Sequence, residues 1–195
     1  MIRVLFVCHG NICRSTMAES VFTHKVKMLG LSDQFLIDSF ATSTEEIGNP
    51  PHRGTVNKLR EVGIPLVPHR AKQITWADYE KSDYIIGMDS ANMRNLNRML
   101  KNDPEEKLYK FLTFAGSGRD IADPWYTGNF DETYEDIQEG CEGFLDYLEK
   151  LGITSVELLP VFAMADEARL TREGRVNYWG YNTIGFFAPE NRYWS

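Results

Sequence analysis

The chain has 195 residues, enough for one α/β domain with a sizeable core and a remainder that is short for a second domain. Its formal net charge of −7 argues against nucleic acid or an anionic membrane as the main partner, because surfaces that bind polyphosphates are basic. No signal-like apolar segment or run of transmembrane length is evident, and three cysteines do not resemble a secreted disulfide framework. We therefore expect a cytoplasmic protein.

The first elements of the chain flank a short polar segment, residues 8–15, with the sequence Cys-His-Gly-Asn-Ile-Cys-Arg-Ser. Before it, the β-branched and aromatic run of residues 2–7 predicts a buried strand. After it, Thr16 and Glu19 form the Thr-x-x-Glu pattern that is typical of a helix start. The sequence therefore predicts a strand, a loop and a helix in that order.

The spacing of Cys8 and Arg14 within this segment suits a loop that binds phosphate. The five residues between them supply enough backbone N–H groups to surround one tetrahedral anion, and the following helix adds its positive end. A cysteine beside a cation at a helix N-terminus is held as a thiolate, which is a competent nucleophile.

The remaining elements follow from hydrophobic periodicity and from turn-forming residues. Further strands are expected at residues 35–40, 84–88 and 107–114, and further helices at residues 53–62, 90–100 and 133–150. Gly30 and Gly63 stand where helices are expected to end. The acidic segment of residues 131–142 contains no histidine, and it suits a solvated helix face better than a metal site. Strands that alternate with helices predict a parallel sheet in a three-layer α/β/α fold.

Two motifs, far apart in the sequence, resemble those of the low-molecular-weight protein tyrosine phosphatases. Residues 10–15, Gly-Asn-Ile-Cys-Arg-Ser, match the core of the phosphate-binding loop of that family. Residues 123–126, Asp-Pro-Trp-Tyr, resemble the loop that supplies its general acid. The resemblance covers residues 1–149, a domain expected to end near residue 150. It implies a four-stranded parallel sheet in the order 2-1-3-4, with the site at the carboxyl ends of the strands.

The resemblance also implies a mechanism for phosphotyrosine proteins or small aryl phosphates. Cys8 attacks phosphorus and forms a phosphocysteine, while Arg14 and the backbone N–H groups of residues 9–14 hold the phosphate oxygens. Asp123 protonates the leaving phenolate and then activates the water that releases inorganic phosphate. Ser15 donates a hydrogen bond to the sulfur, with ordinary helix capping as its alternative role. Neither a metal nor another cofactor is expected.

Other residues are expected to support the loop or to line the substrate pocket. The resemblance assigns Asn11 and Ser43 to bracing the loop and makes His69 a structural support. Trp125 and Tyr126 are expected to wall a slot for an aryl ring, with core packing as the alternative. The other residues expected at the pocket are His9, Gly10, Asn11, Ile12, Cys13, Glu45 and Glu46, with a solvated surface position as the alternative for His9. The two glutamates form an acidic lip where some relatives carry an aromatic residue, so substrate preference cannot be transferred.

Three other functions share parts of this pattern. Arsenate reductases of the same fold need two further cysteines as a relay, but here only Cys13 and Cys141 remain, and Cys141 lies in the last predicted helix. Protein arginine phosphatases of the family tend to carry threonine where this chain has Ile12, so the apolar side chain favours phosphotyrosine. A phosphotyrosine-binding module without turnover is disfavoured by the intact nucleophile, arginine and acid.

The chain continues beyond the predicted phosphatase domain. Residues 151–187 resemble a fragment of glycogen-debranching and isoamylase-type barrels of the α-amylase family, with Val-Glu-Leu-Leu-Pro-Val as its strand. The catalytic residues of that family lie on later strands, so we expect no glycosidase activity and interpret the chain as a chimera. The aromatic residues of 151–195 predict a segment that packs on the first domain or forms a homodimer contact.

Overall fold

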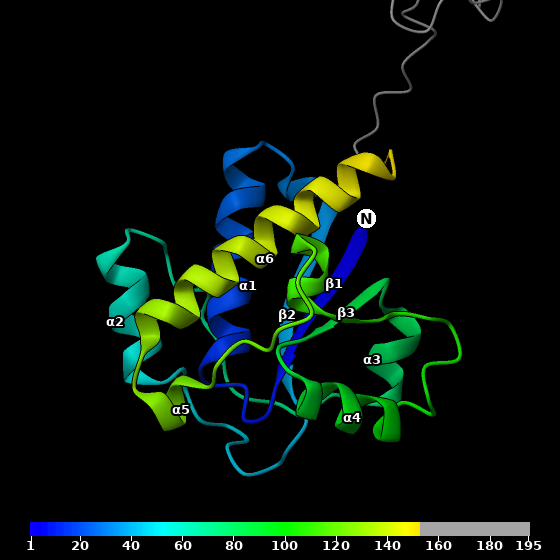
Figure 1. Cartoon of the computed structure of the whole chain (residues 1–195), viewed down its shortest axis with the longest axis horizontal. Coiled ribbons are helices and arrows are strands. Elements are labelled where there is room, and N and C mark those ends of the chain that lie inside the picture. The colour runs from blue at the N-terminus through cyan, green and yellow to red at the C-terminus, as the bar shows by residue number, and fades with distance from the viewer. Residues whose placement is uncertain (153–195) are drawn as a thin grey trace, which may run out of the picture. The chain divides into compact units, whose positions relative to one another are not determined.

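The computed structural model describes residues 1–152, of which Met1–Leu151 form one compact unit (Figure 1). The elements in chain order are β1 (Ile2–Cys8), α1 (Arg14–Met28), the 3₁₀ helix η1 (Ser32–Gln34), β2 (Phe35–Ala41), α2 (Arg53–Glu61), α3 (Trp76–Lys81), β3 (Tyr84–Gly87), α4 (Ser90–Met99), β4 (Leu108–Lys110), the 3₁₀ helix η2 (Phe111–Ala115), α5 (Pro124–Thr127) and α6 (Phe130–Lys150). Within this part of the chain, no helix has the length and apolar character needed to cross a membrane.

The four strands form one parallel sheet in the order β2-β1-β3-β4, which confirms the predicted topology. The register pairs Cys8 with Ala41 of β2 and Val7 with Gly87 of β3. The carboxyl ends of these strands therefore meet at one edge of the sheet, beside the loop that follows β1. Parallel α/β sheets bind their ligands at this edge.

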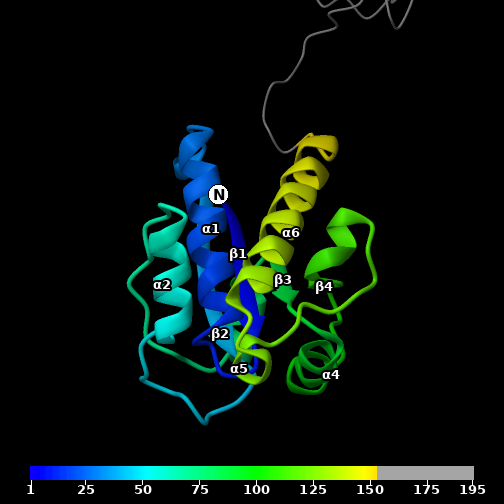
Figure 2. The same ribbon diagram turned by 60° about the vertical axis from the view of Figure 1, so that its left-hand side comes forward.

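Helices cover both faces of the sheet, because successive side chains of β1 point to opposite faces. Leu5 lies in a buried cluster with Leu96 of α4. Phe6, the next residue, contacts Phe22 of α1 with 5.6 Å between ring centroids, and Phe22 contacts Phe144 of α6 at 5.3 Å. Thus α1 and α6 cover one face and α4 covers the other (Figure 2), which confirms the three-layer α/β/α class.

The predicted start of the first helix was wrong. Helix α1 begins at Arg14, so Thr16 lies inside its first turn, where the hydroxyl donates to the carbonyl oxygen of Cys13 at 3.0 Å. Glu19 does not reach back to the helix start. Its buried carboxyl group accepts a hydrogen bond from Ser39 of β2 at 2.6 Å. Tertiary contacts therefore use the two side chains that a capping box would need.

Two other local predictions needed revision. The strand expected at residues 107–114 ends at Lys110, and the chain then turns into η2, where Phe111 packs on Phe6 with 5.2 Å between ring centroids. Helix α3 was not predicted, although its start carries a complete capping box between Thr75 and Asp78. The pattern Thr-x-x-Asp was therefore an available signal that the sequence analysis missed.

The predictions for the C-terminal segment lie outside the described residues from position 153 onward. These are the resemblance of residues 151–187 to a barrel fragment, the strand expected at residues 156–161, the packing on the first domain and the homodimer contact. The division of the chain at residue 150 stays a prediction.

Helix α6 packs against η2 closely enough to require a glycine at position 143. A Cβ atom there would lie 2.6 Å from the carbonyl carbon of Phe114 and 2.7 Å from the backbone nitrogen of Ala115. We expect Gly143→Ala to lower the free energy of unfolding by about 1–3 kcal/mol through this overlap. Alanine in a helix normally stabilises by roughly 1 kcal/mol relative to glycine, so the sign of the change is diagnostic.

Urea denaturation of the purified protein measures this difference. Gly118→Ala is the matched control, because a Cβ atom at Gly118 meets no atom within 4 Å, and we expect it to be nearly neutral. A Gly143→Ala variant as stable as the wild type would show that the contact between α6 and η2 is looser than described.

Candidate active site

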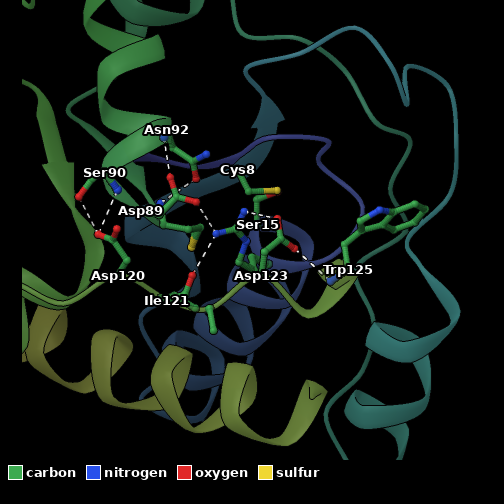
Figure 3. A network of polar contacts seen from close by, with 12 residues as sticks. Cys8, Ser15, Asp89, Ser90, Asn92, Asp120, Ile121, Asp123 and Trp125 are labelled. Atoms are coloured by element: carbon green, nitrogen blue, oxygen red, sulfur yellow. Dashed lines mark hydrogen bonds and ion pairs between the residues drawn. The ribbon is translucent and has the colours of Figure 1, made fainter. Parts of the chain in front are cut away.

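The loop between β1 and α1 curves around the sulfur of Cys8 (Figure 3). Cys8 is buried at the end of β1, and the backbone N–H of Asn11 donates to its Sγ at 3.2 Å. Cys13 is the N-cap residue of α1, and its side chain makes no capping hydrogen bond. The first N–H groups of this 15-residue helix therefore remain available to an anion held by the loop.

The side chain of Asn11 holds the loop in shape. Asn11 has a φ angle of 58°, in the left-handed region that asparagine tolerates better than most residues. Its Oδ1 accepts from the backbone N–H of Lys72 at 3.1 Å, and because a backbone N–H can only donate, this contact sets the orientation of the amide. The Nδ2 group therefore donates to Ser15 Oγ and to Ser39 Oγ, both at 2.9 Å.

This orientation determines what the hydroxyl of Ser15 can do. Ser15 Oγ already accepts a hydrogen bond from Asn11, and Cys8 Sγ lies 3.1 Å away. The hydroxyl hydrogen of Ser15 is therefore free to point at the sulfur. A donor in this position stabilises negative charge that develops on the sulfur. Ser15 lies within α1 rather than at its N-cap, so the alternative capping role is excluded.

A buried acid and histidine lie behind Asn11. His69 Nε2 is 2.7 Å from Asn11 Oδ1, an acceptor, so Nε2 carries the hydrogen. His69 Nδ1 lies 3.3 Å from Glu19 Oε2. Burial raises the pKa of Glu19 to about 7, and burial together with the charge of Lys72 lowers the pKa of His69. Both shifts favour a neutral pair, with its shared proton on Glu19, which avoids an isolated buried charge.

Asn11 and Ser43 were expected to brace the loop, and on β2 the side chain of Asn11 contacts Ser39. Ser43 Oγ accepts instead from the backbone N–H of Glu45 at 3.4 Å. Ser43 still supports the loop through its backbone N–H, which donates to the carbonyl oxygen of His9 at 3.0 Å. The parallel register places Ser39 beside Phe6 on β1 and so directs it under the loop.

Arg14 lies buried under the loop between two carboxylates. Its Nη1 binds Asp89 Oδ2 at 2.5 Å and the carbonyl oxygen of Ile121 at 3.0 Å, and its Nη2 binds Asp123 Oδ2 at 2.5 Å (Figure 3). Burial acts to lower the pKa of Arg14, but the charges of Cys8, Asp123 and Asp89 outweigh it and raise the pKa above its usual value. The guanidinium therefore stays charged.

One nitrogen of this guanidinium remains without a partner among residues 1–152. Arg14 Nε is buried and donates no hydrogen bond there. An unpaired buried donor is costly, and for a charged group the cost is greater. A tetrahedral anion in the loop would supply the missing acceptor, in the side-on geometry in which arginine binds phosphate.

Asp89 is a site residue that the sequence analysis missed. Its Oδ1 caps α4 by accepting from the backbone N–H of Asn92 at 2.6 Å, while its Oδ2 holds Arg14. One carboxylate therefore ties the start of α4 to the guanidinium. The available signal was an acidic residue between the end of a predicted strand and the start of a predicted helix, which is where parallel sheets place site residues.

Asp123 stands at the start of α5, where Pro124 occupies the first turn. Its Oδ1 accepts from the backbone N–H of Trp125 at 3.1 Å, and its side chain is 23% exposed. Trp125 and Tyr126 are 56% and 84% exposed, so the alternative that they belong to the core is wrong. Trp125 also packs edge-on against His52, with 5.7 Å between ring centroids.

These residues enclose a cavity of about 100 Å³ above Cys8. Its lining consists of Cys8, His9, Gly10, Ile12, Cys13, Glu45, Glu46, Asp123, Trp125 and Tyr126. Asn11 was expected at the pocket, but its buried side chain points away into the supporting network. Cys13 lies in the wall as a neutral thiol, because burial raises its pKa to about 12.

Glu19, Asp38 and His69 bring three possible metal ligands within 4.8 Å of one another. Hydrogen bonds already engage these atoms: Asp38 Oδ2 binds Lys72 Nζ at 2.6 Å, and Glu19 Oε2 accepts from Ser39. The group therefore serves to support the loop, and we assign no metal to it.

Comparison with known proteins gives the same family from sequence and from structure. The family model for low molecular weight phosphotyrosine protein phosphatases matches residues 3–153. The low molecular weight protein-tyrosine-phosphatase YfkJ of Bacillus subtilis is 40% identical over 152 residues, which are 77% of this chain and 97% of that protein. Its crystal structure matches with a TM-score of 0.74 over 77% of this chain and 96% of that chain.

Two further solved structures are similar to this chain. One is the low molecular weight protein tyrosine phosphatase of Streptococcus pyogenes, with 43% identity and a TM-score of 0.68 over 77% of this chain and 93% of that chain. The other is a Drosophila arginine phosphatase, with 30% identity and a TM-score of 0.69 over 75% of this chain and 97% of that chain.

The variant Glu19→Gln tests the buried pair behind the loop. Because the pKa of Glu19 is raised from its ordinary 4.5 to about 7, the folded chain holds a proton that the unfolded chain releases. This contribution to stability is complete below about pH 4.5 and is lost as the pH rises through 7. The variant lacks this loss, so we expect its stability relative to the wild type to rise by roughly 1–3 kcal/mol between about pH 5 and pH 8.

Denaturation curves of both proteins at these two pH values measure the change. The difference between variant and wild type cancels most contributions from other titrating groups. A difference that stays constant across this range would mean that Glu19 is ionised throughout.

Proposed function

The chain belongs to the low molecular weight phosphotyrosine protein phosphatase family, and we propose that Cys8 carries out the hydrolysis of phosphotyrosine through a phosphocysteine intermediate. One observation carries this proposal above the others. The cavity above the Cys8 sulfur is bounded by a carboxyl group, Asp123, which also binds the buried cation Arg14. Nucleophile, phosphate-binding cation and proton donor therefore meet at one point.

In the first step, the thiolate of Cys8 attacks phosphorus in line with the bond to the tyrosine oxygen. Phosphate oxygens accept hydrogen bonds from the loop N–H groups and from Arg14, including its unpaired Nε. Because Asp123 Oδ2 rests on Arg14 Nη2, a phosphate that takes this nitrogen frees the carboxyl group. Once released from Arg14, the carboxylate takes a proton from solvent and gives it to the phenolate oxygen as the phosphorus–oxygen bond breaks.

In the second step, the same carboxylate takes a proton from a water molecule. The water oxygen attacks phosphorus, the phosphorus–sulfur bond breaks, and its electron pair returns to Cys8. The Ser15 hydroxyl at 3.1 Å and the Asn11 N–H at 3.2 Å stabilise the departing thiolate. Inorganic phosphate leaves, and Asp123 is again protonated for the next substrate, so side chains and water account for the whole cycle.

The walls of the cavity favour an aryl substrate. Ile12 and Trp125 present apolar surface on the lining, which suits the ring of phosphotyrosine. A phosphoarginine side chain would place a charged guanidinium against the apolar side chain of Ile12, which has no hydrogen-bond acceptor. We therefore infer that phosphotyrosine proteins are the substrates.

Asp123→Asn tests the proton donor. The value of kcat/KM reports the steps up to formation of the phosphoenzyme, and only a poor leaving group needs the proton there. We expect kcat/KM for phenyl phosphate or a phosphotyrosine peptide to fall by about 10²- to 10⁴-fold. For p-nitrophenyl phosphate, whose phenolate leaves without a proton, the loss should be much smaller.

Asp89→Asn is the matched control, because it removes the other carboxylate from Arg14 at the same distance of 2.5 Å. It should lower kcat/KM by a similar factor for both kinds of leaving group. An equal loss for both substrates in Asp123→Asn would remove Asp123 from the acid role. Hydrolysis of a phosphoarginine peptide faster than the matching phosphotyrosine peptide would overturn the substrate class.

A further inference from the structure

The cavity above Cys8 has two chemically different walls. One comes from α5 and presents the exposed rings of Trp125 and Tyr126. The other comes from residues 42–49, between β2 and α2, and presents the carboxylates of Glu45 and Glu46. Apolar contacts explain the first wall, because the substrate carries an aryl ring. The second wall needs a different explanation, because carboxylates repel the phosphate dianion that must pass them.

The acidic wall has a firmly held backbone. The N–H groups of Thr42 and Ser43 donate to the carbonyl oxygens of Cys8 and His9 at 2.9 and 3.0 Å, which joins the segment to the phosphate-binding loop. At its other end, the N–H of Gly48 donates to the carbonyl oxygen of Ala71 at 2.8 Å. These hydrogen bonds fix the position of the backbone at Glu45 and Glu46 relative to Cys8.

The side chains of both glutamates are also directed at the entrance. Glu46 lies over the loop, with its Cγ 3.2 Å from the position of a Cβ on Gly10, and its Oε2 accepts from Asn49 Nδ2 at 2.7 Å. Glu45 Oε2 lies 3.1 Å from His9 Nε2, and the Glu45 side chain is 71% exposed. Each carboxylate thus has a neighbour that orients it and retains the capacity to accept further hydrogen bonds.

The cavity lining contains no lysine or arginine among the described residues that could neutralise this wall. Arg14 lies below the loop, and its charge is committed to the phosphate and to Asp89. His9 pairs with Glu45, and no other side chain of the lining within residues 1–152 offers a positive charge to Glu46, so a lysine or arginine that balances this wall would come from the substrate.

We propose that Glu45 and Glu46 determine specificity by selecting phosphotyrosine segments that carry lysine or arginine next to the phosphotyrosine. The proposal rests on the function proposed above and names the substrate class of the same site. The carboxylates lower the affinity for any phosphate dianion, and a flanking cation offsets this loss by forming an ion pair with them at the rim. Exposed ion pairs of this kind change affinity by roughly 1.5- to 5-fold each.

The test compares kcat/KM for three phosphotyrosine peptides that differ only in the flanking residues, which are lysine, alanine or glutamate. The wild type should prefer the lysine peptide over the glutamate peptide by about 3- to 10-fold, and about 1 M salt should reduce this ratio. In the E45Q/E46Q variant the ratio should approach one. For the alanine peptide, kcat/KM should rise in that variant, because two charges that repel the dianion are gone.

Glu46→Gln and Glu149→Gln form a matched pair, since each removes one negative charge from the chain. Glu149 is exposed in the last turn of α6. That end of α6 lies away from α5 (Figure 1). We expect Glu46→Gln to lower the lysine-to-glutamate ratio and Glu149→Gln to leave it unchanged. A ratio near one in the wild type, or a ratio that persists in E45Q/E46Q, would overturn the proposal. Absence of hydrolysis for all three peptides would instead contradict the proposed function.

Discussion

The side chain of Asn11, a residue with a left-handed φ angle, holds the phosphate-binding loop in shape, and the chemistry of the site depends on its hydrogen bonds. Through one amide, the loop is joined to the backbone of Lys72, to Ser39 on β2 and to Ser15 in α1. The donor at Lys72 decides which way the amide points. That orientation in turn leaves the Ser15 hydroxyl hydrogen for the sulfur of Cys8. A structural hydrogen bond on the far side of the loop therefore prepares the nucleophile.

The placement of charged groups also prepares the site for phosphate. The site keeps its cation, Arg14, buried at the base and its carboxylates nearer the surface, with Asp123 at 23% and Asp89 at 17% side-chain exposure. In this arrangement Asp123 occupies a guanidinium nitrogen that a phosphate would take. Binding of the substrate thus exchanges one anion for another on Arg14 and releases the carboxyl group at the moment when a proton donor is needed. The acidic rim adds a second constraint, since it favours substrates that bring their own positive charge.

Local signals in the sequence predicted most elements of the fold, but they did not predict the contacts between distant elements. The apolar run before Cys8, the glycines at the ends of helices and the alternation of strands and helices all report on neighbouring residues, and the sheet order followed from family resemblance. Ser39 could not be placed in the same way, because its role arises from strand register. Asp89 carried a local signal, its position between a strand and a helix, but that signal does not name Arg14 as its partner. Thr16 and Glu19 are the opposite case, in which a local signal was present but misleading. Their side chains bind Cys13 and Ser39 instead of forming the capping box that the sequence pattern predicts.

The central claim is that phosphate passes through a covalent bond to Cys8. Rapid mixing of the protein with a phosphotyrosine peptide, an acid quench within milliseconds and mass spectrometry of the digested protein test it directly. The account predicts one phosphoryl group on the peptide that contains Cys8, bound to that cysteine, and none in Cys8→Ser, which should also lack turnover because a serine hydroxyl ionises far less readily than a thiol. Turnover without a phosphorylated Cys8, or turnover that survives in Cys8→Ser, would contradict it.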